Sequence, residues 1–160
     1  MTVIIGIDPG SRQTGYGVIR IDGQQQLYMA SGYLKLRDES HPERLKQLFR
    51  GLQEVVQSYA PHEAAIEQIF MHRNPSSALK LGQARGAAIV ALEVPVSEYS
   101  AREIKQSVVG YGAANKDQVQ FMVQRLLKLS GKIQADAADA LAIALCHAQS
   151  RLLRMRLSGK

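Results

Sequence analysis

Four carboxylates stand among apolar residues, where acidic side chains are rare. Asp8 ends the apolar run VIIGID, and Glu67 lies within AAIEQIF. Asp136 and Asp139 lie in ADAADALAIA, at a spacing that puts both side chains on one face of a helix. Because burying an unpaired carboxylate costs several kcal/mol, each of these positions needs a physical explanation.

Each acid has a local explanation. Asp8 can start a turn before Pro9, Glu67 can pair with an arginine, and Asp136 can cap its helix. Together, however, two acids at strand ends and two on a helix can converge on one point. Their mutual repulsion would raise their pKa values unless a cation neutralised them.

A hard divalent cation with oxygen ligands removes this repulsion. Mg²⁺ typically binds a few carboxylates together with water and substrate phosphate. Two such ions about 4 Å apart serve the in-line phosphoryl transfer of many nucleases. The four acids therefore predict a site for metal-dependent phosphodiester hydrolysis.

Other catalytic chemistry has less support in the sequence. No G-x-S-x-G motif marks a serine nucleophile. The single cysteine, Cys146, excludes a disulfide framework and a multi-cysteine zinc site. The histidines do not have the spacing of metal ligands; they are His41, His62, His72 and His147.

The elements that must position the acids begin with three strands. Asp22-Gly23 is a hairpin turn signal, and the strand-like runs on either side of it and before it are TVIIGID, GYGVIRID and QLYMASGYLKL. A period of 3.6 residues predicts an amphipathic helix over residues 42–59. EAAIEQIF then reads as a buried strand.

The second half of the chain alternates helix and strand before ending in helices. We expect a helix over SSALKLGQARGAAIVAL and a short strand over VPVSEY. Ser100 and Asn115 are expected N-caps of the next two helices. The last helix should run from about Ala135 to about Arg151. The order βββαβαβααα predicts an α/β fold with a mixed sheet flanked by helices.

Length and charge limit the functional classes. With 160 residues the chain fits one domain, which we assign to residues 1–150, followed by a short basic tail at 151–160. The net charge of +6 suits a polyanionic partner, although basic residues equally form solvated surfaces. The N-terminus does not look like a signal peptide, and no apolar run is long enough to span a bilayer. We therefore expect a cytoplasmic protein.

Four motifs, in order and over nearly the whole chain, resemble those of the RuvC family of bacterial crossover (Holliday) junction endodeoxyribonucleases. They are GIDPGSRQTGYGV, AIEQIF, LGQARG and QADAADALAIA. The resemblance implies an RNase H-like fold of the retroviral integrase superfamily, with a five-stranded mixed sheet flanked by helices. It also implies a homodimer that resolves four-way DNA junctions in recombination and repair, by paired symmetric nicks with ligatable 5′-phosphate and 3′-hydroxyl ends.

The resemblance also assigns roles to residues of this sequence. Some members of the family have histidine where this chain has Asp139. The positions that match the catalytic, metal-binding acids are Asp8, Glu67, Asp136 and Asp139. The implied cofactor is Mg²⁺, two ions per active site, with Mn²⁺ as a substitute.

DNA contacts follow in the same way. Lys105 and Lys116 match lysines that contact the DNA backbone near the scissile phosphate, and Phe70 matches an aromatic that stacks on an unpaired base. Arg73 and Arg85 are further candidates for DNA contacts. The branch-migration proteins RuvA and RuvB are partners implied by the resemblance alone.

A two-fold symmetric junction would match a two-fold symmetric dimer. The expected interface is the helix SSALKLGQARGAAIVAL, whose small residues allow close approach: Gly82, Ala84, Gly86, Ala87 and Ala88. The alternative is that this helix simply packs on the sheet.

Two other functions fit parts of the sequence. Actin-like ATPases and sugar kinases also begin with a strand, an acid and a glycine-rich hairpin, but they need a second domain to enclose the nucleotide. A junction-binding protein without activity is the other alternative. It would have no reason to hold four carboxylates together against their repulsion.

Overall fold

The computed structural model describes residues 1–37, 39–69 and 74–158. The described part of the chain contains five strands and five helices in the expected order. The strands are β1 (Thr2–Asp8), β2 (Gln13–Asp22), β3 (Gln25–Lys35), β4 (Glu63–Glu67) and β5 (Val96–Tyr99). The helices are α1 (His41–Tyr59), α2 (Pro75–Leu92), α3 (Ala101–Val109), α4 (Lys116–Leu126) and α5 (Ala135–Ser158).

The five strands form one mixed sheet in the order β3-β2-β1-β4-β5. β1, β2 and β3 pair antiparallel through the predicted hairpin, where Gly23 adopts a positive φ of 59°. β4 and β5 are added in parallel to the other edge of β1. The expected mixed sheet flanked by helices is confirmed.

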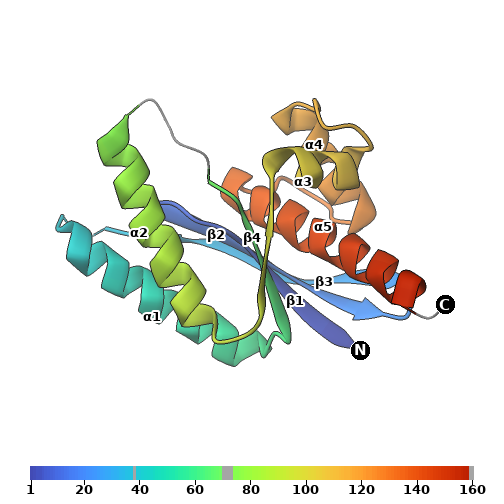
Figure 1. Cartoon of the computed structure of the whole chain (residues 1–160), viewed down its shortest axis with the longest axis horizontal. Coiled ribbons are helices and arrows are strands. Elements are labelled where there is room, and N and C mark those ends of the chain that lie inside the picture. The colour runs from blue at the N-terminus through green and yellow to red at the C-terminus, as the bar shows by residue number, and fades with distance from the viewer. Residues whose placement is uncertain (38, 70–73, 159–160) are drawn as a thin grey trace.

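Helices cover both faces of the sheet (Figure 1). α1 and α2 lie together on one face, over a core that includes Ile5, Leu48 and Leu92. α3, α4 and α5 lie on the other face, over a core that includes Ile4 and Leu141. α5 contributes a nearly continuous buried surface to this second core, as its alanine-rich sequence suggests.

α5 packs closely on the sheet because the strand residues facing it include three glycines, Gly6, Gly15 and Gly17. A Cβ atom at Gly6 would lie 2.1 Å from the carbonyl oxygen of Ala140. One at Gly15 would lie 2.1 Å from the carbonyl oxygen of Asp136. Any side chain at these positions would therefore push α5 off the sheet.

The helix caps follow the sequence prediction, but the end of α5 does not. Ser100 and Asn115 each form a capping box, with Glu103 and Gln118 respectively. α5 continues past Arg151 to Ser158, so much of the basic segment is helical rather than a separate tail. The reason is that this segment consists of good helix formers and has no Gly or Pro before residue 159.

None of the described helices combines the length and the apolar character that crossing a bilayer requires.

Candidate metal centre

Two of the four acids end neighbouring parallel strands. β1 and β4 pair in parallel, with Ile7 opposite Ile66, so the next residues, Asp8 and Glu67, lie side by side at the carboxyl ends of these strands. Asp8 and Glu67 are both half-buried. An acid at the end of a buried apolar run thus marks, in both strands, a side chain at the carboxyl end of the strand.

The other two acids lie at the start of α5, over these strand ends. Gly15 is the β2 partner of Asp8 and packs under the backbone of Asp136, which brings the helix terminus onto the strand ends. Carboxylate oxygens of Asp8, Asp136 and Asp139 all lie within 4.8 Å of one another. We refer to these three residues as the acid cluster. In the part of the chain that the structure describes, no other group of three or more potential ligands satisfies this spacing.

Burial and repulsion make the acid cluster unfavourable when it is fully charged. The pKa of Asp8 rises to about 7, chiefly because of burial and then because of the nearby carboxylates of Asp139, Asp136 and Glu67. Burial also raises the pKa of Glu67, with a further contribution from Asp139. A set of hard oxygen donors in this state fits a divalent cation, which would stabilise the charged form.

Asp136 is held in place by two glutamines that sequence reasoning did not single out. Nε2 of Gln134 donates a hydrogen bond of 2.8 Å to Asp136 Oδ2, and Nε2 of Gln13 donates to the same oxygen. Oε1 of Gln134 also accepts from the backbone N–H of Ala137, so Gln134 rather than Asp136 caps the helix. The sequence signal for this cap is the glutamine directly before ADAADA.

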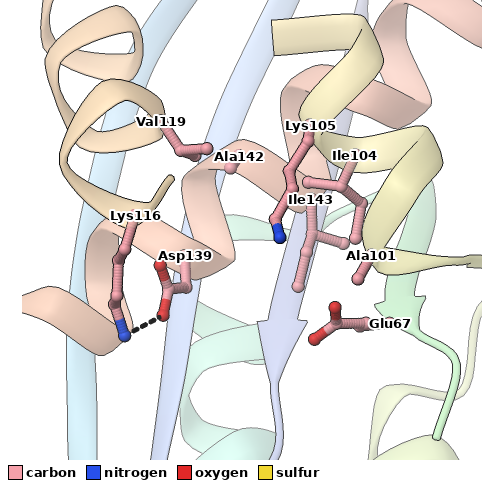
Figure 2. Close-up of a pocket in the computed structure, with 9 residues that line it drawn as sticks. All are labelled: Glu67, Ala101, Ile104, Lys105, Lys116, Val119, Asp139, Ala142 and Ile143. Atoms are coloured by element: carbon pink, nitrogen blue, oxygen red, sulfur yellow. Dashed lines mark ion pairs between the residues drawn. The ribbon is translucent and has the colours of Figure 1, made fainter. Parts of the chain in front are cut away.

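A pocket of about 250 Å³ opens beside the acid cluster and is shown in Figure 2. Glu67 and Asp139 line it together with Lys105 of α3 and Lys116 of α4. Nζ of Lys116 lies 2.9 Å from Oδ2 of Asp139, and Lys105 points into the pocket between Glu67 and Asp139 (Figure 2). The structure therefore brings both predicted lysines to the acids.

Of the arginine and aromatic candidates for DNA contacts, the structure describes Arg85. Phe70 and Arg73 lie outside the described residues. Arg85 pairs through its guanidinium with Glu98 at 2.8 Å, and its Nε donates to the backbone carbonyl of Glu67 at 3.3 Å. Arg85 therefore supports the loop end of β4 but does not pair with the carboxylate of Glu67.

The small residues of α2 divide between two faces. Ala84 and Ala88 are fully buried in the core shared with α1 and the sheet, as the packing alternative predicted. Gly82 and Gly86 face open space. The exposed large hydrophobic residues on this helix are Leu79 and Val90, which are 69% and 66% exposed.

His147 and Cys146 belong to the interior and not to the acid cluster. Nδ1 of His147 bonds the hydroxyl of Tyr99 at 2.8 Å, and its Nε2 lies 2.7 Å from Glu63, which also pairs with Arg151. Cys146 is buried beside them on α5. Both residues are explained by packing.

Residues 4–147 match the family model described as crossover junction endodeoxyribonuclease RuvC. A protein of that name from Acinetobacter baumannii is 60% identical over 153 residues, covering 94% of this chain and 84% of its own. A protein of the same name from Vibrio cholerae is 57% identical over 163 aligned positions, covering 100% of this chain and 94% of its own.

A solved structure supports the same relationship. The chain is similar to Thermus thermophilus RuvC in complex with a Holliday junction substrate, with a TM-score of 0.87 and 34% identity. The match covers 95% of this chain and 96% of that one. The RNase H-like fold expected from the sequence is therefore confirmed.

Proposed function

This chain belongs to the RuvC family of crossover junction endodeoxyribonucleases, and from that membership we propose that it resolves four-way DNA junctions by metal-dependent hydrolysis. The acid cluster is the observation that carries the proposal, because three carboxylates within 4.8 Å of one another need a cation to be charged together. The reaction produces paired, symmetric nicks in recombination and repair, in the cytoplasm.

The cation is Mg²⁺, with Mn²⁺ as a substitute, and two ions per active site suit the number of acids. Asp8, Asp136 and Asp139 would hold them, together with Glu67. When bound, Mg²⁺ supplies Lewis acidity, which activates a water and offsets charge on the phosphate and on the leaving 3′ oxygen. Gln13 and Gln134 keep the carboxylate of Asp136 oriented toward the centre.

The lysines act on the substrate rather than on the cations. Lys105 and Lys116 line the pocket beside the acids, so their ammonium groups attract the scissile phosphate. Water then adds across the P–O3′ bond. Its oxygen joins the 5′-phosphate, and a proton goes to the 3′ oxygen, so both ends are ligatable.

Junction selectivity requires features outside the acid cluster. Phe70 stacks on an unpaired base at the crossover, as the family resemblance implies. Arg73 and Arg85 are further candidates for DNA contacts. A homodimer places two active sites on symmetric strands. The branch-migration proteins RuvA and RuvB are partners that the family resemblance alone implies.

The exposed face of α2 is the surface that we assign to the dimer. Leu79 and Val90 are exposed apolar residues, and Gly82 and Gly86 between them leave open space for a second helix. Val90→Glu should convert the dimer to a monomer in sedimentation experiments and abolish paired cutting. A variant that remains dimeric would assign the interface elsewhere.

The proposed function is tested with a synthetic four-way junction and a linear duplex of the same sequence. We expect cleavage of the junction in Mg²⁺, loss of cleavage in EDTA, and no cleavage of the duplex. Asp8→Asn should abolish cutting, whereas Asp22→Asn, an exposed acid at the hairpin turn, should cut normally. Equal cutting of both substrates would refute junction selectivity.

A further inference from the structure

A second groove opens beside the acid cluster, toward the edge strand β3 and away from Glu67 on β4. It lies between the edge strand β3 and the connection from α4 to α5, with a volume of about 520 Å³. We call it the β3 groove and define it by Tyr28, Ser31, Tyr33, Lys128, Lys132 and Gln134. Because β1 lies between β4 and the β2–β3 hairpin, Asp8 stands between Glu67 on one side and this groove on the other.

We propose that the β3 groove binds the sugar-phosphate backbone of the DNA strand where it leaves the acid cluster. The proposal rests on the proposed nuclease function and deepens it, since it gives the substrate strand a path on a side of the acids to which no residue has yet been assigned. Four observations carry it.

The first is the register of the sheet. Asp8 of β1 pairs with Gly15 of β2, and Gly15 pairs with Tyr33 of β3. Directly paired residues point to the same face, so Tyr33 lies on the α5 face in one row with Asp8. Two strand spacings separate them, roughly 10 Å. A DNA strand whose phosphate lies at Asp8 can therefore continue along this row of residues toward Tyr33.

The second is the chemistry of the β3 wall. Tyr28 and Tyr33 are 40% and 46% exposed, and the hydroxyl of Tyr28 lies 3.1 Å from that of Ser31. These side chains present hydroxyl donors and aromatic rings toward the groove. Hydroxyl groups suit phosphate oxygens, and rings suit sugars and unstacked bases.

The third is the opposite wall, which is basic and held in place. Lys128 and Lys132 are exposed, and neither forms an ion pair with any residue that the structure describes. Nε2 of Gln124 donates to the carbonyl of Gly131 at 2.7 Å, and the N–H of Leu129 donates to the carbonyl of Gln124 at 2.9 Å. These bonds fix the connection, so the lysines project from an ordered turn.

The fourth is continuity with the acids. Gln134 lines the groove and also donates to Asp136, and Ala137 forms part of the same lining. As far as the chain is described, two lysines and no acid line the groove. A strand at the acid cluster therefore meets lysines both in the pocket, at Lys105 and Lys116, and in the β3 groove, at Lys128 and Lys132.

The test compares two double variants of the full chain, matched in charge. Lys128→Ala/Lys132→Ala removes the groove cations. Lys46→Ala/Arg50→Ala removes two exposed cations from α1, on the opposite face of the sheet. Binding to a four-way junction is measured by fluorescence anisotropy in EDTA over a range of salt, and thermal unfolding checks that both variants are folded.

We expect the groove variant to bind at least 10-fold more weakly and to lose about 2 from the slope of log affinity against log salt per bound protomer, while the control keeps both values. Ethylation of backbone phosphates should interfere with binding on one flank of the cleavage site in the wild type and not in the groove variant. An unchanged affinity and slope in the groove variant would overturn the proposal.

The outcomes separate this proposal from the function on which it rests. If the wild type fails to cut junctions but the groove variant loses affinity, the nuclease function fails and the groove remains a DNA-binding surface. If the wild type cuts junctions and the groove variant binds like it, the groove proposal alone is wrong. Tyr33→Phe should bind more tightly than Tyr33→Ala, since it keeps the ring.

Discussion

The ammonium group of Lys116 lies 2.9 Å from Oδ2 of Asp139, so one carboxylate of the acid cluster already has a cation beside it. This contact also raises the pKa of Lys116, mainly through its hydrogen bond to Asp139. The positive charge of Lys116 in turn opposes the rise in the pKa of Asp8. The lysine therefore reduces the repulsion that a metal-free acid cluster must bear.

Lys116→Ala should lower the rate of junction cleavage by about 10²-fold, since an electrostatic contact to the reacting phosphate is typically worth this much. Its effect on folding should be small, below about 1 kcal/mol, because the lysine is largely exposed. Lys116→Arg should recover part of the rate, and Lys46→Ala should cut like the wild type. Single-turnover cleavage assays measure all three; an unimpaired Lys116→Ala enzyme would exclude the assigned role.

Asp8→Asn should stabilise the metal-free protein at pH 7 although it abolishes cleavage. A pKa raised from 3.8 to about 7 means that the folded state binds the proton more tightly than the unfolded state. The contribution of Asp8 to stability is thus full below pH 3.8 and is lost as the pH rises through 7. The full shift corresponds to about 4 kcal/mol, and relaxation should reduce the gain to about 1–3 kcal/mol.

Urea unfolding in EDTA at several pH values checks this sign. The stability of the wild type relative to Asp8→Asn should decline between about pH 4 and pH 7, and Mg²⁺ should restore it at pH 7. Asp22→Asn serves as the control. A difference that grows in favour of the wild type with rising pH would contradict a mutually repelling acid cluster.

Gly15→Ala should damage both packing and metal binding. The added methyl group would lie 2.1 Å from the carbonyl oxygen of Asp136, so the start of α5 would have to move away from Asp8. We expect a loss of about 1–3 kcal/mol in unfolding free energy. Mg²⁺ affinity, measured by calorimetry, should fall as well, and unchanged affinity would show that the close approach does not set the centre.

Glu63→Gln should destabilise the fold without affecting the metal centre. Glu63 pairs with His147 at 2.7 Å and with Arg151 at 2.9 Å, which ties β4 to α5. Burial lowers the pKa of His147. Burial raises the pKa of Glu63, but its hydrogen bonds to Arg151 and His147 outweigh this effect, and the pKa of Glu63 is lowered overall. Because both groups bind a proton less tightly in the folded state, this network loses stability as the pH falls. We expect a loss of about 1–3 kcal/mol at neutral pH, shrinking in acid. Thermal unfolding with exposed Glu54→Gln as control measures it, and a loss that grew in acid would contradict the network.

The sequence predicted the elements and the acids because both depend on local pattern. The apolar run before Asp8 and the three-residue spacing of Asp136 and Asp139 are visible without tertiary contacts. The contacts of Gln13 and Gln134 with Asp136 were missed, because the first spans most of the chain and a glutamine has many possible roles.

Tertiary packing accounts for the other differences. The glycines of β1 and β2 matter only because α5 lies over them, and a sequence does not show which glycine a helix will meet. The burial of Ala84 and Ala88, with Gly82 facing open space, depends likewise on where α1 lies. The predicted end of α5, at about Arg151, is too early because a run of basic residues is equally typical of a tail and of an exposed helix end.

The most direct test of the account maps both nicks on one junction. A four-way junction labelled on opposite strands is incubated with the protein and Mg²⁺, and the products are sized and then treated with DNA ligase. We expect nicks at symmetric positions in the two strands, both sealed by ligase, and none with Asp8→Asn. Nicks at unrelated positions, ends that ligase cannot seal, or cutting by Asp8→Asn would contradict a junction nuclease built on this acid cluster.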